Sequence, residues 1–473
     1  MTRYRGHVIV SAAFLATRLA LHVAGMRMYY VIEWMWLADA RELRERFWHT
    51  LLYFHAMPPG MNAITAFCLR LGGAHPETIA LVVFQAFGLL LANSLFGLAR
   101  ALRFSTGVAA GLALAFSLTP PALYFDHLYI YESPVAGLLA CSAWLFWRAL
   151  RAPSFGRWLA FFATLAAIAL TRTTFHLVWF ALLVALSAWF TPRARLRALL
   201  FAAAGPALLV VGLYAKNWVL FGLFDAFSEG PVSLNLVTTR QLPRDVRDRW
   251  IAEGKLSRYA AIDVFAGPRA YLPLFPSAEN PEYPPELSLL ERPTSGAPNY
   301  NHWFYVKVMP VRRGDAFVVV RERPLLYLDT VRRGLIDFFS PTTRWHPGER
   351  FNAPTPHDQH RSVLGGYERL YNGIFHAFPF APLGIYLLVP ALLVWVVTRA
   401  RALGRAPNAE RRARGALLWF ALLQVGFVTA ASTLFTFQES SRYRYQIEPL
   451  LWLLAALALA RVAKHFGVTS RAL

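Results

Sequence analysis

Ionisable side chains interrupt an otherwise apolar sequence at a few places, and these are the residues that could carry out chemistry. A positioned carboxylate can take a proton from a hydroxyl group, and a guanidinium or ammonium group can hold a phosphate. Ionisable residues in or at the rim of a membrane bundle are unfavourable, so each one invites a functional interpretation. The candidates for a site are Asp39, His55, Asp126, Glu132, Arg172, His176, Lys216 and Arg442.

Asp39 is the candidate general base. It lies in residues 34–48, whose aromatic and leucine residues fall along one side of a helix. This pattern predicts an amphipathic helix at the membrane–water boundary, where a lipid headgroup and a soluble acceptor can both reach a carboxylate. The alternative is an ordinary solvated acid on a helix face, which is how we interpret Glu42 and Glu45.

Residues 53–62 contain a pair of prolines, Pro58 and Pro59. Two successive prolines block the continuation of a helix and favour an extended turn. The segment therefore predicts a rigid elbow that orients His55. A simple connection between two helices is an equally good interpretation of the same residues.

Residues 124–132 hold two acids, Asp126 and Glu132, among several aromatic residues. One interpretation is a carboxylate pair beside an aromatic platform for a sugar or a lipid. The other is an aromatic belt at the membrane interface, with its polar tips in water. The residues favour neither.

Cations recur at the ends of apolar runs. Arg172 and His176 interrupt one run, Lys216 ends another, and Arg442 precedes the last. A desolvated guanidinium suits phosphate recognition, although Arg172 alone could cap a loop between two helices. Several cations at one level predict an anionic headgroup, of which a phosphate is the simplest. His357 and His360 have a metal-like spacing, but no second cluster accompanies them, so we interpret them as loop histidines.

The elements that must position these residues are membrane helices. Of 473 residues, 56% are hydrophobic and 16% charged, whereas soluble chains have about a quarter charged. Many of the apolar blocks approach the length that crosses about 30 Å of hydrocarbon as a helix. A soluble enzyme and a disulfide-rich secreted domain are excluded. The prediction is an all-α polytopic membrane protein with ten spans, at residues 7–25, 78–98, 107–123, 133–147, 158–170, 175–191, 199–218, 376–398, 415–436 and 446–460.

The basic charge of the chain is distributed as a topology signal. With the N-terminus in the cytoplasm, the cytoplasmic loops and termini hold 19 basic residues and one acid, which is most of the net charge of +21. This bias predicts that both termini are cytoplasmic, with contact to anionic membrane lipids as a second effect. The same distribution of charge excludes nucleic acid as a partner. The topology that it predicts places the candidate residues at the outer face of the membrane.

Three regions follow from this topology. Residues 1–218 form an N-terminal membrane module with a first outer loop at 26–77, and residues 372–473 form the C-terminal membrane helices. Between them, residues 219–371 are near neutral, with 19 basic and 17 acidic residues, and predict a small, partly folded outer region of mixed structure. Within it, residues 323–339 have the spacing of an interfacial helix. No repeat period is visible, which argues against inverted-repeat transporters.

Five short stretches, spread from the first outer loop to the last span, carry a resemblance to a known family. They are LADARELRERFWHTLLYFHAMPPGMN (37–62), YESPVAGLLA (131–140), LTRTTFHLVWF (170–180), AKNWVLFGLF (215–224) and SSRYRYQIEPLL (440–451). With them the chain resembles the GT-C glycosyltransferases, in particular the bacterial branch related to protein O-mannosyltransferases and the lipid A aminoarabinose transferase.

The resemblance implies a GT-C-like membrane bundle with a periplasmic site and a polyprenyl-phosphate-linked sugar as donor. The acceptor would be a lipid, a glycan or a protein. The first-loop acid that serves as base in the family corresponds to Asp39, and a second acid to Asp126 or Glu132. The sequence departs from the family where Ala40 replaces a second adjacent acid and where Gly60, not a bulky apolar residue, follows the second proline. No cofactor is certain, and a divalent metal stays open.

The leading hypothesis is glycosyl transfer at the outer face of a bacterial inner membrane, with Asp39 as base and Arg172, Lys216 and Arg442 around the departing phosphate. Its first rival is a lipid or oligosaccharide transporter or flippase, which would string polar residues across the bilayer midplane. Its second rival is a non-catalytic membrane assembly protein. The sugar, the acceptor and the oligomeric state do not follow from the sequence.

Overall fold

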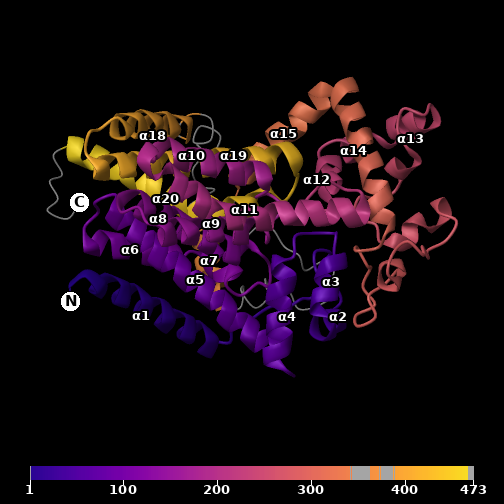
Figure 1. Ribbon diagram of the computed structural model, residues 1–473, viewed down its shortest axis with the longest axis horizontal. Helices are drawn as coiled ribbons and strands as arrows, with labels where there is room; N and C mark the ends of the chain where they lie inside the picture. Colours follow the sequence, from indigo (N-terminus) through magenta and orange to yellow (C-terminus); the bar gives the residue numbers. More distant parts are fainter. Residues whose placement is uncertain are drawn as a thin grey trace.

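The computed structural model describes residues 2–340, 342, 363–371, 373, 387 and 389–466. In these residues the regular structure consists of α-helices and short 3-10 helices. The β-pairing among them is limited to two isolated bridges, Tyr29 with Leu128 and Glu291 with Pro298. A bundle of long helices fills one end of the elongated molecule, and a smaller lobe fills the other (Figure 1). The chain is therefore an all-α protein, as predicted.

The bundle contains helices of membrane-spanning length. Six described helices are long and apolar enough to cross a membrane: α1 (Thr2–Val23), α5 (Pro76–Ala101), α8 (Glu132–Arg151), α11 (Arg193–Phe221), α19 (Ala409–Phe435) and α20 (Ser440–His465). Shorter apolar helices accompany them: α6 (Thr106–Ser117), α9 (Phe155–Ala169) and α10 (Leu177–Phe190). These helices confirm a polytopic membrane architecture. Of the predicted span 376–398, the described residues are 387 and those from 389 on, where α18 (Val389–Gly404) begins.

The predicted span 107–123 is divided into two helices because of its prolines. Leu118 ends α6, and Thr119 then caps α7 (Pro120–Phe125) by accepting a hydrogen bond from the backbone N–H of Ala122. Pro120 begins α7, where a missing N–H group has no consequence for the helix. The break brings residues 126–131 to the start of α8.

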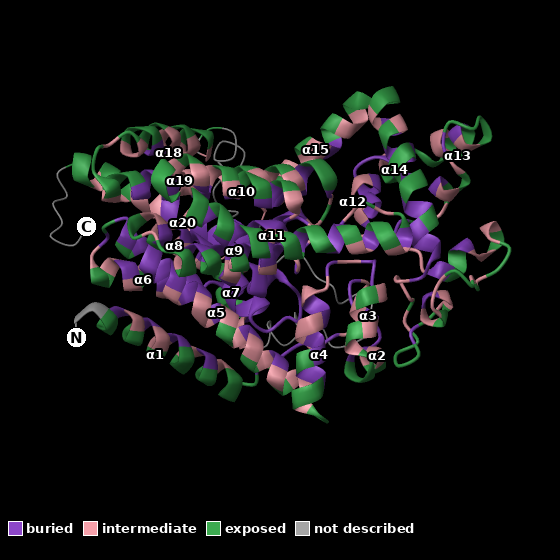
Figure 2. Cartoon of the chain, in the orientation of Figure 1, coloured by how far each residue is buried: buried purple, intermediate pink, exposed green. Residues whose placement is uncertain are grey.

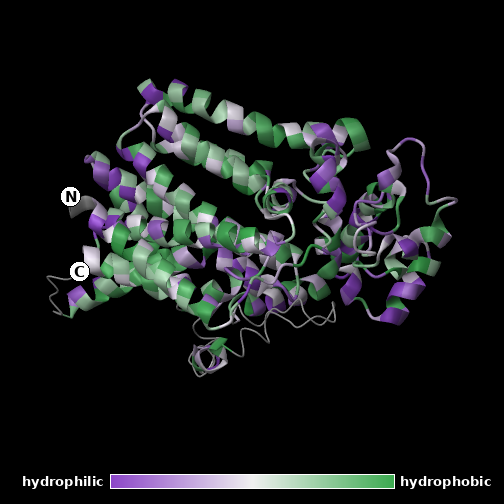
Figure 3. Ribbon diagram, turned by 90° about the horizontal axis from the view of Figure 1, so that it is seen from below, coloured by the Kyte–Doolittle hydropathy of each residue, from purple (hydrophilic) through white to green (hydrophobic). Residues whose placement is uncertain are grey.

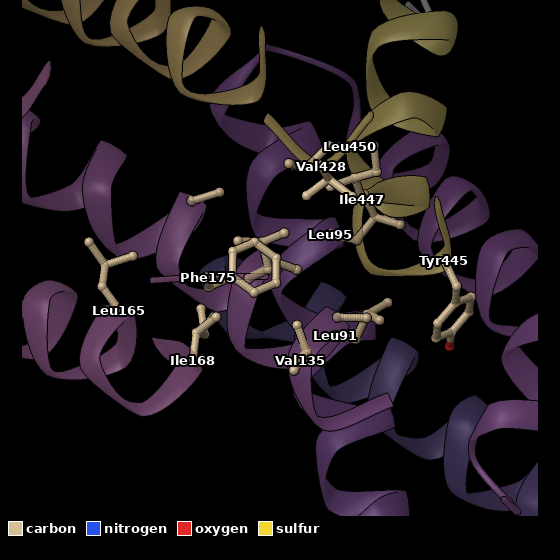
Figure 4. Packing of buried hydrophobic residues seen from close by; sticks show 14 of the residues in the cluster. Leu91, Leu95, Val135, Leu165, Ile168, Phe175, Val428, Tyr445, Ile447 and Leu450 are labelled. Atoms are coloured by element: carbon tan, nitrogen blue, oxygen red, sulfur yellow. The ribbon is translucent and has the colours of Figure 1, made fainter. Parts of the chain in front are cut away.

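The core of the bundle lies between α5 and α8, with α9, α19 and α20 packed around them. Leu91 and Leu95 of α5 meet Val135 of α8, and Ile447 and Leu450 of α20 close the cluster (Figure 4). Figure 2 shows the buried residues gathered in this centre. The outward side chains are apolar too, as in Trp189, which is 85% exposed. In Figure 3 the ribbons of the bundle are coloured mostly as hydrophobic residues, and exposed apolar side chains are expected on helices that face lipid.

Close approach of α5 and α8 depends on a glycine. A Cβ atom added at Gly137 would lie 2.6 Å from the carbonyl oxygen of Phe87. Small residues at such crossings allow helix backbones to pack tightly in a membrane bundle. The spacing of these two helices sets the position of Glu132 at the start of α8.

The continuous helix predicted over residues 34–48 is wrong for residues 34–39, and the rest of the range forms two short helices. Helix begins only at Ala40, as α2 (Ala40–Glu45), followed by α3 (Phe47–Tyr53) and α4 (Gly60–Gly72). The segment before α2 is not helical, and the rings of Trp34 and Trp36 stack there with centroids 4.7 Å apart. Both rings are buried, because this segment packs against the bundle near the bridge between Tyr29 and Leu128.

The smaller lobe, residues 222–340, is called the loop domain below. It contains α12 (Gly230–Leu236), α13 (Arg244–Ala252), α14 (Phe304–Glu322) and α15 (Pro324–Phe338), with 3-10 helices η1 (Thr239–Gln241), η2 (Arg258–Ala261), η3 (Pro268–Leu274) and η4 (Pro285–Ser288). Its apolar core is built around Tyr271, Phe304 and Val308. Helix α15 confirms the helix predicted at residues 323–339. The start of α1 and the end of α20 both lie at the end of the bundle away from the loop domain (Figure 1).

Candidate functional site

A cavity of about 840 Å³ lies where the bundle meets the loop domain. Its walls come from residues 33–36 of the first loop, the turn between α9 and α10, the start of α20, and the α12 region. The starts of α8 and α20 and the turn between α9 and α10 therefore face the same space. This is the convergence of alternate loops that the sequence predicted.

Arg172 is held in the turn between α9 and α10 and lines the cavity. Its guanidinium lies between two tyrosine rings, with Cζ 3.6 Å from the ring centroid of Tyr131 and 4.3 Å from that of Tyr443. The side chain is 3% exposed. Within the described residues its Nε and Nη2 atoms make no hydrogen bond. The aromatic faces stabilise the charge, and these two buried N–H donors lack a hydrogen-bond acceptor among the described residues.

Glu132 lies between two arginines at the start of α8. Its Oε1 is 3.9 Å from Nη2 of Arg172 and 3.8 Å from Nε of Arg442. Glu132 is fully buried, and its two oxygens accept no hydrogen bond from the described residues. Arg442 also bonds Glu439 at 2.6 Å. At these distances Glu132 balances charge without occupying the hydrogen-bonding edges of Arg172.

The proline elbow fixes the turn that carries Arg172. The backbone N–H of Gly60 donates to the carbonyl oxygen of Leu170 at 2.6 Å. A Cβ atom on Gly60 would lie 2.3 Å from Oγ1 of Thr171 and 2.7 Å from that carbonyl oxygen. Only glycine fits here, which explains why a bulky residue is missing after the second proline.

His55 connects the elbow to the loop domain. Its Nδ1 lies 2.8 Å from Oγ of Ser228, and its backbone N–H donates to Oδ1 of Asn301 at 2.8 Å. Burial lowers the pKa of His55 to about 3, so the ring is neutral at physiological pH. Lys216 donates to the carbonyl oxygen of Phe54 in the same elbow. Neither His55 nor Lys216 lines the cavity.

Asp39 caps the start of α2. Its carboxylate accepts hydrogen bonds from the backbone N–H groups of Arg41 and Glu42, at 2.9 and 3.4 Å. It also accepts from the N–H and the hydroxyl of Thr294 in the loop domain, at 2.9 and 2.8 Å. Asp39 is buried and is not among the residues that line the large cavity. Its contacts join the first loop to the loop domain.

Asp126 and His176 also lie outside the lining of the cavity. Asp126 forms a buried ion pair with Arg18 of α1 at 2.6 Å and accepts from the hydroxyl of Ser133 at 2.8 Å. His176 caps α10, where its Nδ1 accepts from the backbone N–H of Val178 at 3.3 Å. Of the eight predicted residues, Arg172 and Arg442 line the cavity and Glu132 lies between them.

The predicted site residues do not include several residues that line the cavity. Glu33 and Glu229 both line it, and neither forms an ion pair in the described part of the chain. Burial raises the pKa of Glu229 well above its usual range. Glu33 directly precedes the two stacked tryptophans, Trp34 and Trp36. An acid beside this pair of aromatic residues was the signal in the sequence that pointed to a site. Arg292, from the loop domain, donates to the backbone of the same segment.

A metal site does not emerge from the described residues, in which no group of three or more His, Cys, Asp or Glu side chains is arranged to hold an ion. His357 and His360 lie outside the described residues.

Comparison with known proteins gives a similarity among solved structures. No protein family matches the chain, and no curated protein does. Among solved structures, it is similar to the crystal structure of ArnT from Cupriavidus metallidurans in the apo state, with 15% identity over 89% of this chain and 76% of that one, and a TM-score of 0.32. A TM-score this low carries no argument, so the function is argued from the cavity.

Proposed function

We propose that this protein is a glycosyltransferase that moves a sugar from a polyprenyl-phosphate donor to an acceptor hydroxyl in the large cavity. The observation that carries the proposal is Arg172, which is buried between two tyrosine rings and whose Nε and Nη2 donate no hydrogen bond within the described residues, with Oε1 of Glu132 3.9 Å from Nη2. A phosphate group would supply the missing acceptors. The resemblance of the sequence to GT-C glycosyltransferases supports the same reaction class.

In this reaction the acceptor oxygen attacks the anomeric carbon and inverts it. The bond between that carbon and the phosphate oxygen breaks, its electrons pass to the phosphate, and the proton of the hydroxyl passes to a carboxylate. Arg172 and Arg442 would stabilise the charge that develops on the leaving phosphate, an effect of about 3 kcal/mol for each well-placed donor. Asp39 is the sequence-based candidate for the carboxylate.

The location of the site supports a lipid-linked donor. The positive-inside bias assigns the basic loops to the cytoplasm, so the loop domain and the cavity would face the periplasm of a bacterial inner membrane. Nucleotide sugars are confined to the cytoplasm, and a prenyl chain could lie between helices while its phosphate reaches Arg172. The acceptor, a lipid, glycan or protein, would enter under the loop domain.

The transporter alternative is tested by turnover in detergent. Purified protein is given a panel of synthetic polyprenyl-phosphate hexoses and pentoses with lipid and glycoside acceptors, and released polyprenyl phosphate is measured. A glycosyltransferase turns over at least one donor. A transporter shows no turnover, because detergent leaves no second compartment, and a non-catalytic assembly protein shows none either. Wild-type protein that is inactive across the panel would refute the proposal.

A further inference from the structure

Glu33 is a cavity residue whose position the structure fixes from both sides. Arg292, which is 3% exposed, donates from Nη1 to the carbonyl oxygen of Ile32 at 3.0 Å and from Nη2 to that of Trp34 at 2.7 Å. The backbone on each side of Glu33 is thus held by one buried guanidinium. Oε2 of Glu33 accepts from the N–H of Ile32 at 3.0 Å. A side chain held in this way is preorganised, as a catalytic group must be.

The other carboxylates that line the cavity are engaged or inaccessible. Glu439 pairs with Arg442 at 2.6 Å. Asp263 pairs with Arg240 at 3.9 Å, and its Oδ1 accepts from a backbone N–H at 2.8 Å. The oxygens of Glu229 are buried from solvent, and burial favours its neutral form. Each of the three therefore differs from Glu33, because Glu439 and Asp263 pair with an arginine and Glu229 is buried.

Asp39 has a structural role in this arrangement. Its Oδ1 accepts hydrogen bonds from the N–H groups of Arg41 and Glu42 and from the hydroxyl of Thr294, and its Oδ2 accepts from the N–H of Thr294. The two bonds from Thr294 join the first loop to the loop domain. Glu33, in contrast, is half-buried, makes one short-range hydrogen bond, and lines the same cavity as Arg172.

We propose that Glu33 is the general base of the transfer reaction. Its carboxylate takes the proton of the acceptor hydroxyl as that oxygen bonds to the anomeric carbon, while the carbon–phosphate oxygen bond breaks and the electron pair leaves with the phosphate. The products are the glycoside, the polyprenyl phosphate and protonated Glu33, which returns its proton to solvent. Arg292 is a positioning residue, because it acts through the backbone of Glu33. This inference rests on the glycosyltransferase function proposed above.

The test compares Glu33→Gln with a matched control in the same loop. Glu45→Gln removes an acid whose side chain is 54% exposed and pairs with Arg41 on α2, outside the cavity. Each variant is purified in detergent and given the polyprenyl-phosphate sugar that wild type uses. Release of polyprenyl phosphate is measured against pH, and binding of polyprenyl phosphate alone is measured separately.

We expect Glu33→Gln to lower kcat by about 10²–10⁴-fold, the usual range for a lost general base. KM for the donor, binding of polyprenyl phosphate and the melting temperature should stay near wild type, and the acid limb of the pH profile should disappear. Glu33→Asp should recover part of the rate, and Glu45→Gln should match wild type.

A Glu33→Gln enzyme with wild-type kcat would overturn the assignment of the base while leaving the glycosyltransferase function intact. So would an Asp39→Asn enzyme that loses the acid limb at an unchanged melting temperature, because that result would assign the proton to Asp39. Inactivity of the wild type itself would instead overturn the proposed function, and this inference with it.

Discussion

Replacing Arg172 should abolish the binding of a lipid phosphate. The change Arg172→Ala removes Nε and Nη2, neither of which donates a hydrogen bond within the described residues, although Nη2 lies 3.9 Å from Oε1 of Glu132. A hydrogen bond to a charged group contributes about 1.5–3 kcal/mol, so two bonds to a phosphate contribute about 3–6 kcal/mol. Because about 1.4 kcal/mol is a factor of ten in Kd, the affinity for polyprenyl phosphate should fall by about 10²–10⁴-fold.

Arg172→Lys separates charge from geometry. A lysine keeps the positive charge between Tyr131 and Tyr443 but cannot present two N–H groups in one plane. Its affinity should therefore fall between that of wild type and that of Arg172→Ala. The lysine variant is also a control for misfolding. It keeps a positive charge beside the buried Glu132, so it does not leave that carboxylate buried without a charged partner at the position of Arg172.

The assay measures binding of polyprenyl phosphate to the detergent-solubilised protein. The readout is the rise in melting temperature that a ligand of the folded state produces. Arg240→Ala is the control. Arg240 also lines the cavity, but it is 39% exposed and already pairs with Asp263, so its loss should change Kd by less than about tenfold, as expected of an exposed pair. The reasoning is refuted if Arg172→Ala binds polyprenyl phosphate as tightly as wild type does.

Three further predictions concern topology and stability. A reporter fused after Ser228 should read periplasmic and one after Arg405 cytoplasmic, and the opposite result at either point would separate the cavity from a periplasmic donor. Asp39→Ala should lower stability by about 1–3 kcal/mol through the lost cap and the unsatisfied N–H of Thr294, measured as a lower melting temperature; an unchanged value would contradict the structural role. Acidification should destabilise the elbow: burial lowers the pKa of His55 to about 3, so below about pH 6.5 the unfolded chain binds a proton that the folded chain excludes. The melting temperature should therefore fall from pH 7 to pH 5, by less in His55→Gln, and a pH-independent value would argue against a buried neutral ring.

The sequence predicted the convergence of charges because membrane topology imposes it. Alternate turns of a helical bundle lie on the same side, so Arg172 and Arg442 reach one cavity although 270 positions separate them in the numbering. The buried Glu132 between them was among the predicted acids for the same reason. The sequence left open the distance of Glu132 from each arginine, which depends on how α8 packs against α9 and α20.

The first loop was harder to predict. Residues 34–37 form a turn, in which the N–H of Leu37 donates to the carbonyl oxygen of Trp34 at 3.0 Å. The helical spacing of the later leucines gave no sign of this turn. The role of Asp39 depends on Thr294, a partner 255 positions away. Such a contact cannot be inferred from local patterns, and neither can the clamp of Arg292 on either side of Glu33.

The tight contact of Gly60 with the turn of Leu170 and Thr171 has a thermodynamic consequence. The elbow and the turn that carries Arg172 cannot shift independently, because no space separates Gly60 from that turn. An acceptor that repositions the first loop would then alter the free energy of binding a phosphate at Arg172, and linkage requires the reverse effect to be equal. The two substrates would thus bind cooperatively without sharing a single contact, and a methyl group added at Gly60 would change that coupling free energy as well as the individual affinities.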